Sequence, residues 1–217
     1  MPNPPIDVGG VQSEILVGSV ALYTSPAGVA LPNMDGTLPI VWPAPTTSPV
    51  ADGWTKVGYT EAGVDLDYAP TFKPIYVDEE LAEVRQILER EKATVVTKLA
   101  QATLDKLNLA ISASGITKVV ADATHAAITK FVTGSGIQAE MQVGFQGYSP
   151  EALATNPNLP LPRLFVGYRA IAMGTVKSTH KRADKVMLDL SFQLLADSTK
   201  AVGERLYKIV DHTAPHT

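Results

Sequence analysis

Four histidines are the residues of this 217-residue chain best suited to metal or acid–base chemistry. They are His125, His180, His212 and His216. None of them stands at helix-face spacing from a second histidine or a carboxylate, as the HExxH pattern of a metal-binding helix requires. We therefore interpret them as solvated or hydrogen-bonded surface residues, and the sequence predicts no metal site.

The patterns of a nucleophile or a phosphate-binding loop are also missing from the sequence. No serine lies in a GxSxG elbow, and Gly134-Ser135-Gly136 is an ordinary loop tripeptide. There is no GxGxxG opening a helix, no GK[ST] and no cysteine. The absence of cysteine fits a reducing compartment such as a bacterial cytoplasm. We predict a protein that is not an enzyme and has no cofactor; a Ser–His–Asp triad, whose members need only meet in space, leaves a hydrolase as an alternative.

The pair Asp65 and Asp67 is the one carboxylate constellation of interest. It alternates with Val64, Leu66 and Tyr68, which predicts a half-buried strand with an acidic outer face. Such a pair can act as general acid and base or bind a cation, but it is more typical of the solvated side of a strand.

A second, longer alternation near the carboxyl end also predicts a strand. Its apolar positions run from Val186 to Leu194, and its polar side carries Asp189, Ser191 and Gln193.

The elements that position these residues are mostly strands. We expect strands over 15–24, 54–60, 64–68, 71–77, 93–99, 139–148, 164–173 and 186–194, and a closing strand or short helix plus strand over 203–210. Pro74 places its strand at an edge or bulge. Residues 103–112 predict one amphipathic helix, capped by Thr103, and residues 114–136 are ambiguous. The fold class we predict is mainly β, a β sandwich or barrel with one flanking α-helix and long proline-rich loops.

Prolines and charges mark the parts that depart from regular pairing. We expect one domain over residues 1–217, with an extended arm over 1–14, a proline-rich loop over 25–52 that holds at most one short strand near 38–41, a loop at the NPNLPLP run of 156–162, and a flexible tail over 211–217. The charged segment 78–92 should project from the body. Leu81, Val84 and Leu88 stand at helical spacing, which favours a local helix over 78–91, with a hairpin or loop as the alternative.

Composition limits the partners. Hydrophobic residues make up 45% and charged residues only 18% of the chain, and the net charge is −4. A protein that grips nucleic acid usually has a basic excess, so the sequence argues against tight DNA binding and is compatible with a surface past which DNA slides. There is no signal-peptide pattern and no apolar run of about 20 residues, so we expect no membrane contact and a chain that is soluble and intracellular at synthesis.

The one basic cluster lies in a predicted turn and contains Lys177, His180, Lys181, Arg182 and Lys185. It has no interleaved aromatic residues on which bases could stack. It reads as a solvated turn, or as a partner for the acidic 78–91 segment of a neighbouring copy. Opposite charges on two faces suit head-to-tail stacking, because a heterologous contact needs complementary surfaces.

Several of these patterns together resemble the tail tube (major tail) proteins of long-tailed bacteriophages of the siphophage type. The resemblance covers about half of the chain. It rests on Trp54 with Val57-Gly58, Thr60 and Gly63-Val64; on Val77-Asp78 before the charged segment; on Ala93–Leu99 leading into Ala102-Thr103-Leu104 and Leu107; and on Arg169-Ala170, the basic turn and the strand ending at Ala196-Asp197. Gln101 stands where the family often has an acidic residue.

The resemblance implies a structural virion protein. Six copies would form a ring whose inner strands join into one barrel, and rings would stack into the tail tube through which DNA is ejected. Implied partners are other copies of the chain, the tape measure, tail terminator and distal tail or baseplate proteins, and double-stranded DNA passing without specific binding. The location implied is the virion tail, and the host bacterial cytoplasm during assembly.

On this interpretation two sets of residues have assembly roles. The candidates for the lumen wall are Asp65, Asp67, Asp189, Ser191 and Gln193. The candidates for contacts between subunits or rings are Asp78, Glu79, Glu80, Leu81, Val84, Arg85, Leu88, Lys177, Lys181 and Arg182. The alternatives are another ring component of the same fold (a tail terminator, a connector, or the tube of a type VI secretion or contractile injection system) and, from another class, a small-ligand-binding β barrel or hydrolase.

Overall fold

The computed structural model describes residues 20–35, 40–43, 53–58, 60–76, 82, 84–100, 103–111, 116–119, 126–131, 138–153, 156–173 and 187–211. Several expectations lie outside these residues. They concern the N-terminal segment 1–14, the segment 78–81, the basic turn 177–185 and all four histidines.

The expected mainly β fold is confirmed. The larger, antiparallel sheet has the strand order β2-β1-β7-β8-β9-β4-β3, with β10 paired to β8, and β5 and β6 form a separate hairpin. The strands are β1 (Ala21–Pro26), β2 (Thr55–Lys56), β3 (Thr60–Ile75), β4 (Arg85–Leu99), β5 (Ile116–Val119), β6 (Ile128–Phe131), β7 (Met141–Leu153), β8 (Asn156–Ala172), β9 (Leu188–Leu194) and β10 (Tyr207–Asp211).

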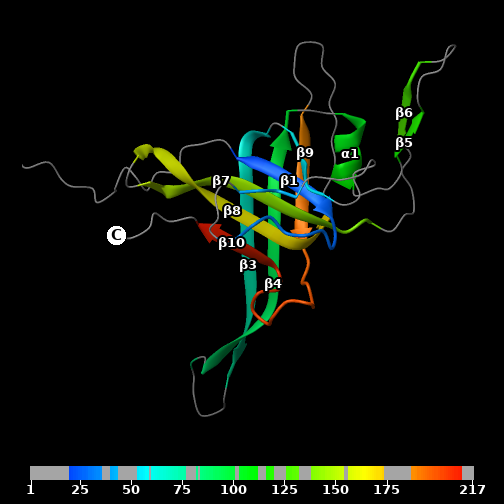
Figure 1. Ribbon diagram of the computed structural model, residues 1–217. Coiled ribbons are helices and arrows are strands. Elements are labelled where there is room, and N and C mark those ends of the chain that lie inside the picture. The colour runs from blue at the N-terminus through cyan, green and yellow to red at the C-terminus, as the bar shows by residue number, and fades with distance from the viewer. Residues whose placement is uncertain are drawn as a thin grey trace, which may run out of the picture.

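The eight strands of the larger sheet run in two directions. In Figure 1, β1, β7, β8 and β10 cross the line of β3, β4 and β9. The two groups are joined where the end of β8 pairs with β9, from Ala170 opposite Leu194 to Ala172 opposite Phe192. The core contains side chains of both groups, including Leu22, Phe165, Val95 and Phe192, which have no exposed surface. Burying each such side chain is worth about 1.5–3 kcal/mol relative to leaving it exposed.

A second, smaller cluster contains Leu164 and Val166 of β8 together with Trp54. The described part of the proline-rich segment packs on it. Trp42 stacks on Tyr23 of β1 with ring centroids 4.2 Å apart. Trp54 Nε1 donates to the carbonyl oxygen of Ala30 at 2.8 Å. Of the short strand expected near 38–41, residues 40 and 41 are described, and they are not in a strand.

The helix expected over 103–112 is α1 (Leu104–Ile111). The hydroxyl of Thr103 accepts a long hydrogen bond of 3.4 Å from the Lys106 backbone N–H, as expected of an N-terminal cap. Asp105 lies in the first turn, where a negative charge favours the helix dipole. Ala110 belongs to the core cluster, and Leu107 and Leu109 pack against it.

The three strands expected over 54–60, 64–68 and 71–77 are arranged differently. The first shortens to β2, and the other two belong to the single 16-residue strand β3. The strand carries a bulge near its start, since the register shifts between Thr60 and Val64 and Gly63 has a φ of 83°. Thr97 Oγ1 donates to the carbonyl oxygen of Gly63 at 2.6 Å. Pro74 does lie on an edge strand, because β3 ends the strand order.

The helix predicted over 78–91 is wrong for its described part, because Arg85–Glu91 belongs to β4. The ladder to β3 continues from Ala93 out to Arg85, which pairs with Ile75. The sheet therefore overrides the helical spacing of the apolar residues, and the hairpin alternative is the one found. The expected projection is visible in Figure 1, where the ends of β3 and β4 extend below the body.

The loop predicted at NPNLPLP is also wrong, because these residues begin β8 and pair with β7. Pro160 and Pro162 are two residues apart, so the two positions that lack an N–H donor face the same lateral side of the strand. β10 pairs on that strand only from Arg163 onward. Its last residue, Asp211, was expected in the tail but accepts hydrogen bonds from Arg163.

Candidate functional site

The five predicted lumen residues lie on one face of the sheet. Asp65 pairs with Val96, which pairs with Ser191; Asp67, Thr94 and Gln193 form the next row across β3, β4 and β9. Lys98 opposite Asp189 forms a third row on the same side. Directly paired residues in a sheet share a face. The set that the sequence placed on two separate strands is therefore brought together by β4.

This polar face is open, whereas the reverse side of the same strands is core. Asp65, Asp67 and Asp189 are exposed, and Ser191 and Gln193 are half-buried. Their chain neighbours Leu188, Leu190, Phe192 and Leu194 are buried, so β9 alternates strictly between the core and the polar face. We call the surface made by Asp65, Asp67, Asp189, Ser191 and Gln193 the polar wall.

The polar wall shows no arrangement suited to catalysis or to metal binding. Asp65 and Asp67 are two residues apart on one strand, which separates their Cα atoms by about 6.6 Å. Among the described residues no group of three or more histidines and carboxylates could hold a metal ion. What the wall can do chemically is remain hydrated and present mainly negative charge.

Next to the polar wall, the sheet ends at an open edge. β3 is the last strand in the order, and within the described residues it pairs only with β4. An open edge presents unpaired N–H and C=O groups to a further strand. Pro70 and Pro74 interrupt the outer part of this edge by removing two N–H donors, so an added strand would pair best with the part of β3 beside the wall.

Beyond the body, β3 and β4 continue as an exposed two-stranded extension, Ala69–Ile75 with Arg85–Lys92, which we call the arm (Figure 1). Its basic residues gather on one side. The side continuous with the core carries Pro70, Phe72, Pro74, Gln86 and Leu88, and the side continuous with the polar wall carries Lys73, Arg85, Arg90 and Lys92 together with Ile75 and Ile87.

Large apolar side chains on the arm and at its end are open to solvent. Phe72 is 51% exposed, Leu88 45%, Ile87 50% and Val84 55%. Three predicted contact residues, Val84, Arg85 and Leu88, are thus placed on or beside the arm and exposed. Asp78, Glu79, Glu80 and Leu81, and the basic Lys177, Lys181 and Arg182, lie outside the described residues.

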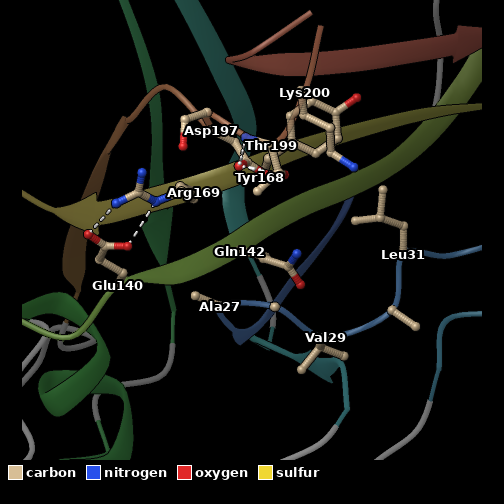
Figure 2. A pocket seen from close by; sticks show the side chains of 13 residues that line it. Ala27, Val29, Leu31, Glu140, Gln142, Tyr168, Arg169, Asp197, Thr199 and Lys200 are labelled. Atoms are coloured by element: carbon tan, nitrogen blue, oxygen red, sulfur yellow. Dashed lines mark hydrogen bonds and ion pairs between the residues drawn. The ribbon is translucent and has the colours of Figure 1, made fainter.

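A cleft of about 580 Å³ that the sequence did not predict lies on another part of the surface. Figure 2 shows Tyr168 and Arg169 of β8 near Gln142 of β7, with the 27–31 segment and the 197–200 turn around them. The Lys200 ammonium lies 5.0 Å from the centre of the Tyr168 ring, a cation–π contact. In the turn, Thr199 donates backbone and side-chain hydrogen bonds to Asp197, and these lower the pKa of that carboxyl.

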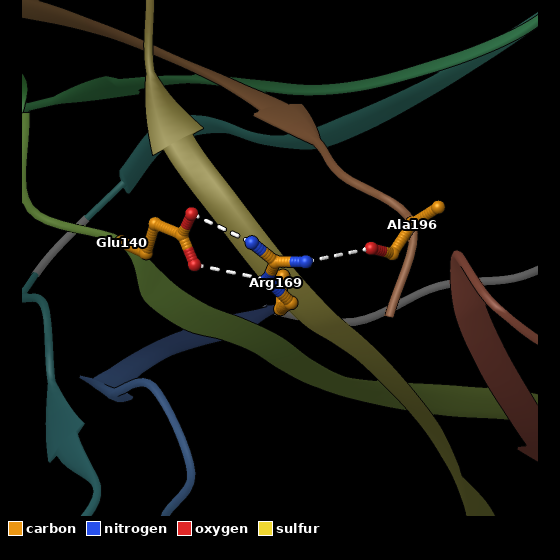
Figure 3. A network of polar contacts seen from close by, with 3 residues as sticks. All are labelled: Glu140, Arg169 and Ala196. Carbon is orange, nitrogen blue, oxygen red and sulfur yellow. Dashed lines mark hydrogen bonds and ion pairs between the residues drawn. The ribbon is translucent and has the colours of Figure 1, made fainter. Parts of the chain in front are cut away.

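Arg169 is fully engaged at the side of this cleft. It donates two hydrogen bonds to Glu140, at 2.9 and 2.7 Å, and a third at 2.9 Å to the carbonyl oxygen of Ala196 (Figure 3). The bidentate contact lowers the pKa of the Glu140 carboxyl and raises that of the guanidinium. The pair joins β8 to the start of β7 and the end of β9. No sequence signal points to it, because its members are far apart in the chain.

A second cleft, of about 670 Å³, lies at the root of the arm. Its lining comes from β3, the arm, the end of β9, the loop after β9 and the start of β10: Tyr68, Arg90, Glu91, Gln193, Leu194, Leu195, Ala196, Val202, Gly203, Arg205, Leu206 and Tyr207. The Tyr68 hydroxyl donates to Glu91 at 2.7 Å, and this hydrogen bond raises the pKa of Tyr68. We call this cleft the root groove.

Neither the models of known protein families nor the curated proteins give a match to this sequence. Within the described residues, no helix combines the length and the apolar character that crossing a bilayer demands.

Proposed function

We propose that this chain is a tail tube subunit, a structural protein whose copies form hexameric rings that stack into the DNA conduit of a bacteriophage tail. In this proposal the two crossing groups of strands are the sandwich or barrel of the tail-tube fold, α1 is its flanking helix, and 25–52 is a long loop on its outer surface. The sequence resemblance supplies the family, and the geometry of the sheet supports the role.

The observation that carries the proposal is the polar wall beside an open edge. Five residues chosen from sequence as lumen-facing lie on β3 and β9, on the same face of the sheet, and that face ends at the unpaired side of β3. Copies that add strands to this edge extend the same polar face around a ring. Closure of the ring removes the exposed edge, which is why a ring is more stable than a free monomer.

The charge of the wall fits a conduit. The three carboxylates Asp65, Asp67 and Asp189 outnumber Lys98, the one basic residue in the same three rows, so the surface repels phosphate and disfavours the Lys and Arg contacts that would hold duplex DNA. The half-buried Ser191 and Gln193 add hydrogen-bonding groups that keep the wall wet.

The arm is the part of the molecule suited to contacts between copies. Its apolar side chains, including Phe72 and Leu88, continue the core face outward with no cover from the described residues of the same chain. An apolar patch exposed in this way on a soluble protein marks an interaction surface. The candidates Val84, Arg85 and Leu88 lie on or beside it.

Electron microscopy of the purified protein tests the proposal. We expect rods of constant width with a central channel in negative stain, and a sedimentation coefficient that rises with protein concentration. Rings that never stack would favour a terminator or connector of the same fold. A protein that stays monomeric at millimolar concentration would refute the proposal.

A further inference from the structure

The cleft of about 580 Å³ beside Tyr168, which we call the side cleft, has no role in the proposed assembly. It is formed by the 27–31 segment, β7, β8 and the 197–200 turn, and none of its lining residues belongs to the polar wall or to the arm. Its volume lies within the range of pockets that bind small molecules, roughly 300–1,000 Å³. The groups that line it are arranged for one kind of ligand.

Gln142 of β7 brings an unpaired hydrogen-bond donor into the side cleft. Only 5% of this residue is exposed, and its Oε1 accepts a hydrogen bond from the Ser25 hydroxyl at 2.8 Å. The other end of the amide, Nε2, has no acceptor among the described residues. Figure 2 shows this amide in the middle of the cleft. Because a buried donor without an acceptor is unfavourable, the site favours a ligand that places an oxygen atom there.

The carboxylates of the lining already have partners. Glu140 accepts two hydrogen bonds from Arg169, at 2.9 and 2.7 Å. Asp197 accepts two from Thr199, at 3.0 and 2.8 Å, and these lower its pKa more than the nearby charge of Lys200 does. A cationic ligand would therefore meet Lys200 without gaining a free carboxylate from the described lining.

The Lys200 ammonium is the charge of the lining that forms no ion pair with a described residue. It lies 5.0 Å from the centre of the Tyr168 ring, which holds it over an aromatic face. This contact leaves N–H groups of the ammonium free to donate to an acceptor. One positive charge beside the N–H donors of Gln142 matches a group with one negative charge and two acceptor oxygens, which is a carboxylate.

Val29 and Leu31 form the apolar side of the cleft. Both are half-buried and pack against the smaller core cluster, and Figure 2 shows them across the cleft from Lys200. A ligand that reaches from Lys200 to these side chains needs a short hydrocarbon part. An inorganic anion would reach Lys200 but would leave Val29 and Leu31 uncovered.

We propose that the side cleft binds a small carboxylic acid that carries a hydrocarbon chain or ring. The carboxylate lies between the Lys200 ammonium and Gln142 Nε2, and the hydrocarbon part lies on Val29 and Leu31. All of these residues belong to one copy of the chain, so this inference goes beyond the proposed function and does not depend on it. The ligand also joins the 27–31 segment to the 197–200 turn.

Binding of hexanoate tests the site, with hexanamide and hexylamine as probes of the same length and different charge. Saturation-transfer NMR observes the ligand, so it works on single copies and on rods alike, here at pH 7 and constant ionic strength. We expect hexanoate to bind with a Kd of about 0.1–10 mM, as is usual for a ligand of its size. Hexanamide should bind at least about tenfold more weakly, and hexylamine should show no saturable binding.

Variants assign the binding to the side cleft. Lys200→Gln removes the positive charge and should weaken hexanoate binding about tenfold or more, whereas Lys200→Arg should stay within about threefold of wild type. Gln142→Glu places a negative charge beside the expected carboxylate and should abolish binding. Lys208→Gln removes an exposed lysine outside the cleft and should bind hexanoate as wild type does. Circular dichroism melts of each variant separate a lost site from a lost fold.

Several results would overturn the inference. Equal affinities for hexanoate and hexanamide would show adsorption on apolar surface, and equal hexanoate binding by wild type and a folded Lys200→Gln would remove the charged contact. Stronger binding of hexylamine than of hexanoate would assign the cleft to cations. Rod formation is measured separately, so rods without hexanoate binding refute this site alone, and hexanoate binding without rods refutes only the proposed function.

Discussion

Gly144 on β7 makes the most exacting prediction about the fold. A Cβ added there would lie 2.6 and 2.8 Å from the Trp42 ring atoms Cη2 and Cζ3, and 3.0 Å from the backbone oxygen of Phe165. The carbonyl is part of the sheet and cannot withdraw. Gly144→Ala therefore forces the Trp42 ring to move.

The ring is held from three directions, which sets the cost. Trp42 stacks on Tyr23, meets Trp54 edge-on at a centroid distance of 4.9 Å, and donates its Nε1 hydrogen to Gln146 at 3.0 Å. Displacing it sacrifices part of each contact. We expect Gly144→Ala to lower the free energy of unfolding by about 1–3 kcal/mol, the usual range for overpacking. For a chain of this size that is a fall in melting temperature of about 2–12 °C.

A neighbouring glycine provides the matched control. At Gly147 the nearest atom to an added Cβ is Val20 Cγ2 at 3.6 Å, an ordinary contact, so Gly147→Ala should change stability by less than about 0.5 kcal/mol. Both variants would be followed by urea and thermal melts with far-UV circular dichroism. In a Trp42→Leu background, which removes the two clashing atoms, Gly144→Ala should cost at least about 0.5 kcal/mol less. Equal melting curves for the two alanine variants would refute the reasoning.

Two further predictions concern the polar wall and the pH dependence of stability. Asp65→Lys with Asp67→Lys should leave rod formation intact, since both side chains are exposed, but should impair DNA delivery by phage carrying the variant; unchanged infectivity would show that they do not line the channel. The pKa of Glu140 is lowered by Arg169, so the stability from this pair is present above the ordinary carboxyl pKa of 4.5 and is lost as the pH falls through the lower folded value. Glu140→Gln should therefore reduce the melting temperature at pH 7 more than at pH 3, and an equal reduction at both would contradict the assignment.

The sequence predicted secondary structure best where the residue pattern of a strand or helix depends on that element alone. The alternation over 186–194 gave β9, and the apolar face over 103–112 gave α1, because in both cases a single buried face dictates the residue types. The prediction failed where pairing with another strand determines the secondary structure. The Leu81, Val84 and Leu88 spacing indicated a helix, but Arg85–Leu99 pairs with β3, so Leu88 lies in a strand.

The candidate site shows the same division. The sequence identified the residues of the polar wall, because polar side chains alternate with apolar ones on each strand. It gave no means of knowing that β4 lies between β3 and β9, which is what joins Asp65 to Ser191. The root groove and the Glu140–Arg169 pair were missed entirely. Both form from segments distant in the chain, and neither has a local pattern.

The energetics of the two exposed surfaces would give them different roles in the proposed assembly. Covering Phe72 and Leu88 on the arm removes apolar area from water, and full burial of such a side chain is worth about 1.5–3 kcal/mol. Covering Asp65 and Asp67 would take two charged carboxylates out of water. Neither has a basic residue in its row of paired residues to compensate, so burying them costs free energy. If copies assemble as proposed, association should therefore proceed through the arm and the open edge of β3. The polar wall would then stay in contact with water, which in a closed ring would lie in the channel.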